Sequence, residues 1–112
     1  MIWFGDTPAL CIIAQPVTAQ RLLRLVLTGE LDVISAADLR KQLSAGLTTD
    51  QPAAVELDLA AVTFLDAAGV RCLIDCLHDV ERAGCTFAVI DPSDAVRQVL
   101  RISGLIGVLG VR

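Results

Sequence analysis

Short hydrophobic runs with polar interruptions recur along the chain and predict a set of strands. The runs occupy residues 10–14, 22–28, 53–59 and 86–91. Only a short segment with Pro16 separates the first two runs, so we expect them to pair as an antiparallel hairpin. In the third run apolar residues alternate with Glu56 and Asp58, which predicts a strand that has one wetter face and ends near Leu59.

Apolar residues at three- and four-residue steps predict a helix after the second strand. Ala36, Leu39 and Leu43 follow this spacing. Ser35, with Asp38 three residues later, is expected to cap the start of this helix. The polar segment 48–52, which ends in a proline, is expected to break it.

Two further helices are expected in the second half of the chain. The first spans about 69–83, where apolar residues fall on one side and charged residues on the other. The second begins at Pro92-Ser93 and ends near Gly104. The hydrophobic tail 105–111 is expected to pack against an edge of the sheet.

The order strand, strand, helix, strand, helix, strand, helix predicts the fold class. After the hairpin each strand is followed by a helix, which is typical of right-handed βαβ crossovers. We therefore expect an α/β fold with a mixed sheet of about four to five strands and helices packed on it. At 112 residues, without repeats or linkers, the chain is expected to form a single domain over residues 1–112.

Composition narrows the classes of partner. The net charge of −4 gives no indication of a basic surface for nucleic acid. The aromatic share of 4% predicts an aliphatic core. No window holds the roughly 20 apolar residues of a spanning helix, and the segment 1–6 lacks the basic region of a secretory signal. We expect a cytoplasmic protein without direct membrane insertion, a monomer or weak dimer, in which Trp3 and Phe4 cover the domain's own sheet.

The cysteines do not form the framework of a secreted scaffold, so thiols are expected. Cys11 and Cys85 border strands and are interpreted as small buried hydrophobes. Cys72 and Cys76 are one helical turn apart, too far to bridge each other. Cys72 lies about 130° from the apolar centre of its helix and near a helix N-terminus, which lowers a thiol's pKa. A redox switch that pairs Cys72 or Cys76 with Cys85 or Cys11 is a hypothesis that these positions leave open.

No catalytic constellation is present in the sequence. His78 falls on the charged side of its helix and has no nucleophile beside it in a known motif. Phosphate-binding and dinucleotide-binding loops are missing, and Cys72, Cys76 and His78 do not supply the four ligands of a structural zinc site. We expect no enzyme activity, no cofactor and no metal.

Three short motifs carry a family resemblance. They are Gly29-Glu30-Leu31-Asp32, the segment 55–70 with Asp66-Ala67-Ala68-Gly69 at its end, and Asp91-Pro92-Ser93. In this order and spacing they resemble the STAS family, named for sulfate transporters and anti-sigma factor antagonists, across nearly the whole chain. The resemblance implies a single STAS-like domain.

The resemblance also implies a protein partner. In the antagonists of this family the loop reads Asp-Ser-Ser-Gly or Asp-Ser-Thr-Gly, and an anti-sigma factor with a histidine-kinase-like ATP site phosphorylates the hydroxyl residue before the glycine. Here Ala68 holds that position and Ala67 precedes it, so the phosphorylation switch is absent from its usual place. The contact surface that the resemblance implies consists of Asp32, Ser35, Asp66, Ala67, Ala68, Gly69 and Arg71.

Two alternatives remain open at the level of the sequence. Thr63 and Ser35 are the nearest hydroxyl groups for a substitute phosphorylation site, although a strand end and a helix cap explain them better. Regulation by a thiol or a ligand would replace the missing switch. A STAS subunit of a transporter or of a stress-signalling scaffold, in which no switch is needed, is the alternative function.

Overall fold

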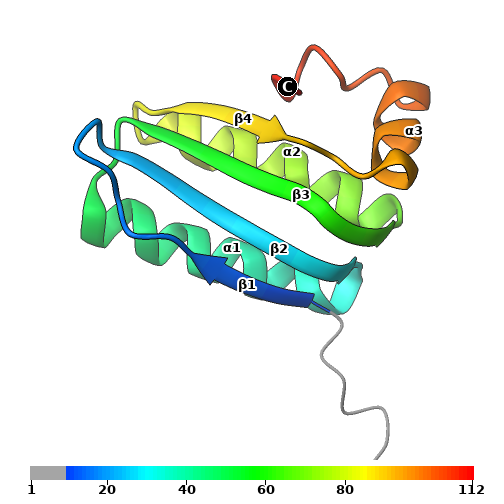
Figure 1. The fold of residues 1–112 in the computed structure, drawn as a ribbon, viewed down its shortest axis with the longest axis horizontal. Coiled ribbons are helices and arrows are strands. Elements are labelled where there is room, and N and C mark those ends of the chain that lie inside the picture. Colours follow the sequence, from blue (N-terminus) through cyan, green and yellow to red (C-terminus); the bar gives the residue numbers. More distant parts are fainter. Residues whose placement is uncertain (1–9) are drawn as a thin grey trace, which may run out of the picture.

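A computed structural model describes residues 10–112 (Figure 1). Residues 1–9 lie outside the described residues, and with them the expectation that Trp3 and Phe4 cover the sheet. The fold follows the predicted order of strands and helices.

A mixed four-stranded sheet forms the centre of the domain. The strands are β1 (Leu10–Ala14), β2 (Leu22–Leu31), β3 (Ala54–Leu65) and β4 (Thr86–Ile90). Their order in the sheet is β1-β2-β3-β4. β1 runs antiparallel to β2, as the hairpin prediction requires, while β3 lies parallel to both β2 and β4.

Two long helices cover one face of this sheet. The long helices are α1 (Val33–Asp50) and α2 (Ala67–Arg82), and a shorter helix, α3 (Asp94–Ile102), follows β4. α1 and α2 lie side by side behind the strands, while α3 sits at one end of the sheet beside β3 (Figure 1). The α/β class with a mixed sheet is therefore confirmed.

The alternating pattern of β2 explains why the helices pack on this face. Leu23, Leu25 and Leu27 are at most 1% exposed and point toward α1 and α2. The residues between them face the other side of the sheet and are only half-buried. Burying each leucine contributes about 1.5–3 kcal/mol relative to an exposed side chain, so the helical face holds the aliphatic core.

Three predicted element boundaries are wrong. β2 does not end at Thr28 but continues to Leu31, because its last residues pair with the end of β3. β3 does not end near Leu59 but continues to Leu65, because Val62 and Leu65 are buried and their segment pairs with the end of β2. α1 is not broken at Thr48 but continues to Asp50, immediately before Gln51 turns the chain with a φ of 44°.

The C-terminal segment closes the outer edge of β4, as the sequence predicts for the tail. The Val89 amide donates to the Leu109 carbonyl, and the Arg112 amide donates to the Val89 carbonyl. On the face away from α1 and α2, Glu56 accepts hydrogen bonds from Arg24 at 2.8 Å and from the Arg112 guanidinium. Burial works to raise the pKa of Glu56, but these two guanidinium groups outweigh it and lower that pKa.

One glycine of α2 lies in close contact with the ends of β2 and β3. Leu31 pairs with Leu65 in the sheet, and Gly69 packs directly on this pair. A Cβ atom on residue 69 would lie 2.4 Å from the Leu31 carbonyl oxygen and 2.6 Å from Leu65 Cδ1. Only a residue without a side chain lets the first turn of α2 approach the end of β2 this closely.

We expect Gly69→Ala to lower the free energy of unfolding. Alanine is favoured over glycine inside a helix by about 1 kcal/mol, but the clash with a backbone oxygen forces an overpacking cost of about 1–3 kcal/mol or more. Urea denaturation measures the balance. Gly107→Ala is the control, because no atom lies within 4 Å of its added Cβ, and it should stay within about 0.5 kcal/mol of wild type. Equal stability of both variants would contradict the close approach.

Candidate functional site

The starts of α1 and α2 lie next to each other at the carboxyl ends of the two central strands, β2 and β3. Leu31 and Leu65 are the last residues of β2 and β3 and pair with each other. An aspartate follows each of them and is the N-cap of the next helix: Asp32 for α1 and Asp66 for α2. The sheet register therefore places two strand-aspartate-helix turns side by side.

A capping box fixes the start of α1. Asp32 Oδ1 accepts hydrogen bonds from the Ser35 and Ile34 amides, each at 3.0 Å. Ser35 Oγ accepts in return from the Asp32 amide at 2.9 Å and donates to the Glu30 carbonyl at 3.0 Å. The prediction that Ser35 and Asp38 cap this helix is thus wrong. Asp32 is the N-cap, and Ser35, three residues later, is its partner in the capping box.

This arrangement removes Ser35 from the protein surface. Its side chain is 3% exposed and its hydroxyl is fully engaged, so it holds the loop in place and does not offer an acceptor to another protein. Thr63 is exposed, and its hydroxyl lies 3.3 Å from the Gly29 carbonyl. A substitute phosphorylation at Thr63 stays a prediction.

The start of α2 presents methyl groups where the family resemblance expects a hydroxyl. Asp66 Oδ1 accepts from the Gly69 amide at 2.8 Å, which caps the helix. Ala67 is exposed and Ala68 is half-buried, while Gly69 is buried against Leu31. Asp66, Ala67 and Ala68 are therefore available at the carboxyl end of β3, and Gly69 is a packing residue.

Two exposed apolar residues lie at the start of α1. Val33 is 71% exposed and Ile34 is 77% exposed, although both are large and hydrophobic. Sequence reasoning missed them; the signal was two consecutive apolar residues directly after Asp32, outside the spacing of Leu39 and Leu43. We name the helix-start surface for the residues that form it: Asp32, Val33, Ile34, Ala67, Ala68 and Arg71.

A cavity opens between the two helix starts. Its volume is about 330 Å³, and its lining joins Val33 of α1 to Ala68 and Arg71 of α2. Cys72 and Ala36 lie in the same wall. The helix-start surface therefore contains a depression between α1 and α2, and Cys72 is part of its lining.

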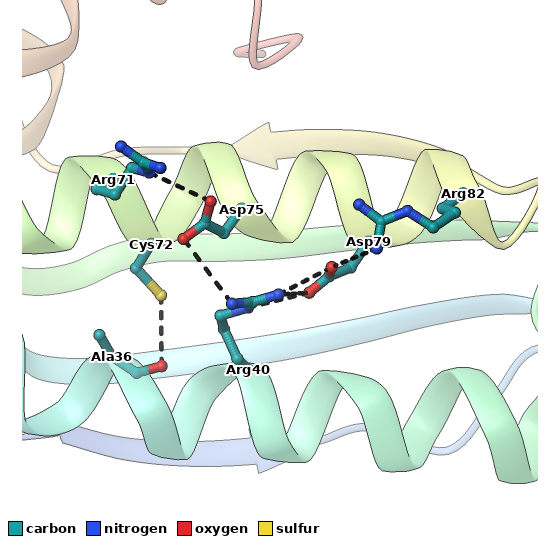
Figure 2. A network of polar contacts seen from close by, with 7 residues as sticks. All are labelled: Ala36, Arg40, Arg71, Cys72, Asp75, Asp79 and Arg82. Atoms are coloured by element: carbon teal, nitrogen blue, oxygen red, sulfur yellow. Dashed lines mark hydrogen bonds and ion pairs between the residues drawn. The ribbon is translucent and has the colours of Figure 1, made fainter.

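An ion-pair network crosses from α1 to α2, and three of its residues, Arg40, Arg71 and Asp75, also line this cavity (Figure 2). The Arg40 guanidinium donates to both carboxylate oxygens of Asp79, at 2.7–2.9 Å through Nη2, and lies 3.9 Å from Asp75. Arg71 pairs with Asp75 at 3.4 Å, and Arg82 approaches Asp79 at 3.7 Å. The charged side of α2 thus holds α1 in place, in addition to facing water as its helical pattern predicts.

The structure corrects the expected burial of the cysteines. Cys11 is exposed and Cys85 is half-buried, so the prediction that both are buried is wrong. Cys72 points away from the sheet but is 2% exposed, because α1 covers that side of α2. Cys76 is 0% exposed. All four are free thiols, and a switch that pairs them stays a prediction.

The remaining candidates for chemistry do not join a site. His78 is exposed on α2, as its helical position predicts. Among residues 10–112, no group of three or more His, Cys, Asp or Glu side chains is arranged to hold a metal ion. In the same part of the chain, no helix has both the length and the apolar character needed to cross a membrane.

The fold and the site define an α/β domain with both long helices on one face of a mixed sheet and two capped helix starts at the carboxyl ends of its central strands. The family model described as STAS domain matches residues 14–112. The chain belongs to the STAS domain family, which confirms the resemblance seen in the three motifs.

Two known proteins that are similar in sequence to this chain are named as anti-sigma factor antagonists. It is 27% identical over 79 residues to "Anti-sigma F factor antagonist" of Lysinibacillus sphaericus, covering 70% of this chain and 68% of that protein. It is 30% identical over 81 residues to "Anti-sigma-F factor antagonist RsfB" of Mycobacterium tuberculosis, covering 72% and 65%. The chain thus spans about two thirds of the length of the curated relatives it matches.

A solved structure confirms the fold. The crystal structure of an anti-sigma factor antagonist from Mycobacterium paratuberculosis superimposes with a TM-score of 0.78. The alignment covers 96% of this chain and 89% of that one at 20% sequence identity. At this identity the likeness concerns the arrangement of strands and helices only.

We expect the capping box to make stability depend on pH at the acidic end. The hydrogen bond from the Ser35 amide lowers the pKa of Asp32 below its usual value. A folded-state pKa below the unfolded one gives stability that is present above the unfolded pKa, about 3.9, and lost as pH falls through the folded pKa. Urea denaturation at several pH values should show wild type more stable than Asp32→Asn near neutral pH, with the difference shrinking below the unfolded pKa. A difference that is constant with pH would contradict this role.

Proposed function

We propose that this domain is a protein-binding regulator of the anti-sigma factor antagonist type. Its partner is an anti-sigma factor with a histidine-kinase-like ATP site, and the helix-start surface is the contact. Because Ala68 has no hydroxyl, the domain stays in the binding-competent state. It works by association and not by catalysis.

The observation that carries the proposal is the position of Ala68. It lies in the first turn of α2, two residues after the cap Asp66, in the wall of the cavity beside Val33. A phosphate at this position would add about −1.5 to −2 charges two residues from the Asp66 carboxylate and in the same cavity as the apolar Val33. The alanine keeps this surface free of that charge permanently.

The chemistry of the helix-start surface supports a protein partner. This surface contains two large exposed hydrophobic side chains, Val33 and Ile34, and complete burial of each would contribute about 1.5–3 kcal/mol. It also contains two charged groups, Asp32 and Arg71. Protein interfaces typically combine apolar and polar groups in this way. The names of the related proteins, anti-sigma factor antagonists, suggest an anti-sigma factor as that protein.

We expect Ala68→Glu to weaken partner binding by at least about tenfold, or about 1.4 kcal/mol, because its carboxylate imitates the phosphate. The measurement is capture from native cell extract with mass spectrometry, followed by calorimetric titration of the captured partner. Ala68→Gln has the same size without the charge and should lose much less. Ala95→Glu adds the same charge on exposed α3 and should bind like wild type.

The same experiment separates the alternative function. If wild type and Ala68→Glu both capture the same transporter or scaffold components, the helix-start surface is not the contact. The domain is then a structural STAS subunit, and the antagonist proposal fails.

We expect Ala68→Ser to restore a phosphorylation switch. The hydroxyl would stand in the first turn of a helix whose N-terminus stabilises an added anion. Incubation of this variant with the captured partner and ATP should add about 80 Da, the mass of one phosphoryl group, to the peptide that contains residue 68. Wild type and Ala67→Ser are the controls. A phosphorylated wild type would show that the acceptor is another residue.

A further inference from the structure

Two large hydrophobic residues of the helix-start surface are uncovered in the part of the chain that the structure describes. Val33 and Ile34 are 71% and 77% exposed, although aliphatic side chains of this size are usually buried. They are consecutive residues in the first turn of α1, and Val33 also lines the cavity between α1 and α2. Contiguous exposed apolar groups mark a surface that another segment or molecule covers.

The first strand of the sheet begins at the same end of the domain. Leu10, the first residue of β1, pairs with Gly29 of β2, which is only four residues before Val33. The start of β1 lies beside the end of β2, where the chain enters α1 (Figure 1). The residues that precede β1 are therefore joined to the domain next to the helix-start surface.

The number of residues before β1 is sufficient to reach this surface. The four residues from Gly29 to Val33 span at most about 14 Å. Directly paired residues of antiparallel strands have Cα atoms about 5 Å apart, so the Cα atom of Val33 lies within roughly 20 Å of that of Leu10. Trp3 stands seven residues before Leu10 and can lie up to about 23 Å from it. The segment is thus long enough to bring Trp3 to Val33.

The composition of this segment suits an apolar surface. Ile2, Trp3 and Phe4 are three consecutive large hydrophobic residues. Trp3 and Phe4 are two of the four aromatic residues of the sequence, and an aromatic side chain buries about 150–250 Å² when it is covered. The cavity of about 330 Å³ beside Val33, which Ala68 also lines, offers a recess for one of these rings.

Other exposed hydrophobic residues fit this segment less well. Ile102 and Val108 lie in α3 and in the tail that closes the β4 edge, whereas β1 is the opposite edge of the sheet. Ile13 is 58% exposed on the sheet face away from α1 and α2, where Arg24 and Thr28 are polar neighbours. Two adjacent hydrophobic residues beside a recess are present only at the start of α1 among these places.

We propose that residues 2–4 fold back onto the helix-start surface and cover Val33 and Ile34, so that this segment competes with a protein partner for the same side chains. In the absence of a partner the surface is occupied by its own chain, and the partner displaces it. The inhibitory half of the proposal rests on the proposed function, since it assigns to the segment the control that phosphorylation of residue 68 cannot exert. The covering of Val33 and Ile34 does not depend on that function.

The contact is intramolecular, so it need not be tight. A short tether gives an effective concentration of about 1 mM, and a contact with a dissociation constant of about 0.3 mM then leaves the surface uncovered for about a quarter of the time. The apparent affinity of a competing partner falls in proportion to the uncovered fraction. A partner that covers the whole helix-start surface can therefore still displace the segment.

The first test uses fluorescence and needs no partner. Trp3 is the only tryptophan of the sequence, which has no tyrosine, so the emission reports on this segment alone. The reference is a synthetic peptide of residues 1–9. Acrylamide should quench the wild-type protein at least about twofold less than the peptide, with emission at shorter wavelength, because the ring is covered for most of the time. Quenching and emission equal to those of the peptide would overturn the proposal.

Matched double variants locate the covered surface. Val33→Ser/Ile34→Ser removes two exposed side chains and should raise the quenching to the level of the peptide. Ile102→Ser/Val108→Ser removes two exposed side chains elsewhere and should be quenched like wild type. Circular dichroism checks that both variants are folded, as expected for substitutions of exposed residues. Equal quenching of both variants would overturn the proposal.

Two further outcomes would assign the segment to another place. If Ile13→Ser exposes Trp3 and Val33→Ser/Ile34→Ser does not, the segment covers the open sheet face, as the sequence-based expectation for Trp3 and Phe4 had it. If the protection of Trp3 disappears on dilution, the segment covers a second copy of the chain. Either result would overturn the proposal.

The second test separates inhibition from the proposed function. Calorimetric titration of the captured partner compares wild type with Trp3→Ser/Phe4→Ser, which should bind at least about threefold more tightly because nothing competes with the partner. Equal or weaker binding would overturn the inhibition alone. Absence of partner binding by both proteins would overturn the proposed function, while the fluorescence result would still decide whether the segment covers Val33 and Ile34.

Discussion

The pairing of Leu31 with Leu65 is the contact on which the rest of the domain depends. Because these two residues are the last of β2 and β3 and are paired in the sheet, the aspartates that follow them begin α1 and α2 beside each other. Gly69 permits this because nothing larger fits between its helix and the Leu31 carbonyl. The cavity, the exposed Val33 and the position of Ala68 are all consequences of this short distance.

Much of this arrangement could be predicted from the sequence. Period-two and helical patterns found each element in its right order, and the three motifs led to the correct family because each contains the residues of a strand-to-helix turn. The boundaries were less accurate. Ala60 and Ala61 do not look like strand residues, yet β3 continues through them because the end of β2 supplies partners for its backbone.

The parts that sequence reasoning missed depend on neighbours distant in the chain. A helical wheel places Cys72 on the polar side of α2, but it contains no information about α1, whose Ala36 covers that side. The same limitation applies to Ser35, which a local motif identifies as a cap and which tertiary packing turns inward. Val33 and Ile34 are the opposite case, because these hydrophobic residues stand out only once the structure shows that no element within residues 10–112 covers them.

The C-terminal segment along β4 has a consequence for assembly. Its hydrogen bonds with Val89 occupy backbone groups at the β4 edge of the sheet, and the ion pair between Arg112 and the Glu56 side chain of β3 holds the segment there. Among residues 10–112, β1 is then the edge that remains, and it is only five residues long. Open edges are where sheets of separate molecules join and grow into aggregates. The exposed hydrophobic side chains of Val33 and Ile34 therefore lie on a domain in which the chain itself seals the β4 edge, and in which the other edge described within residues 10–112 is a strand of five residues.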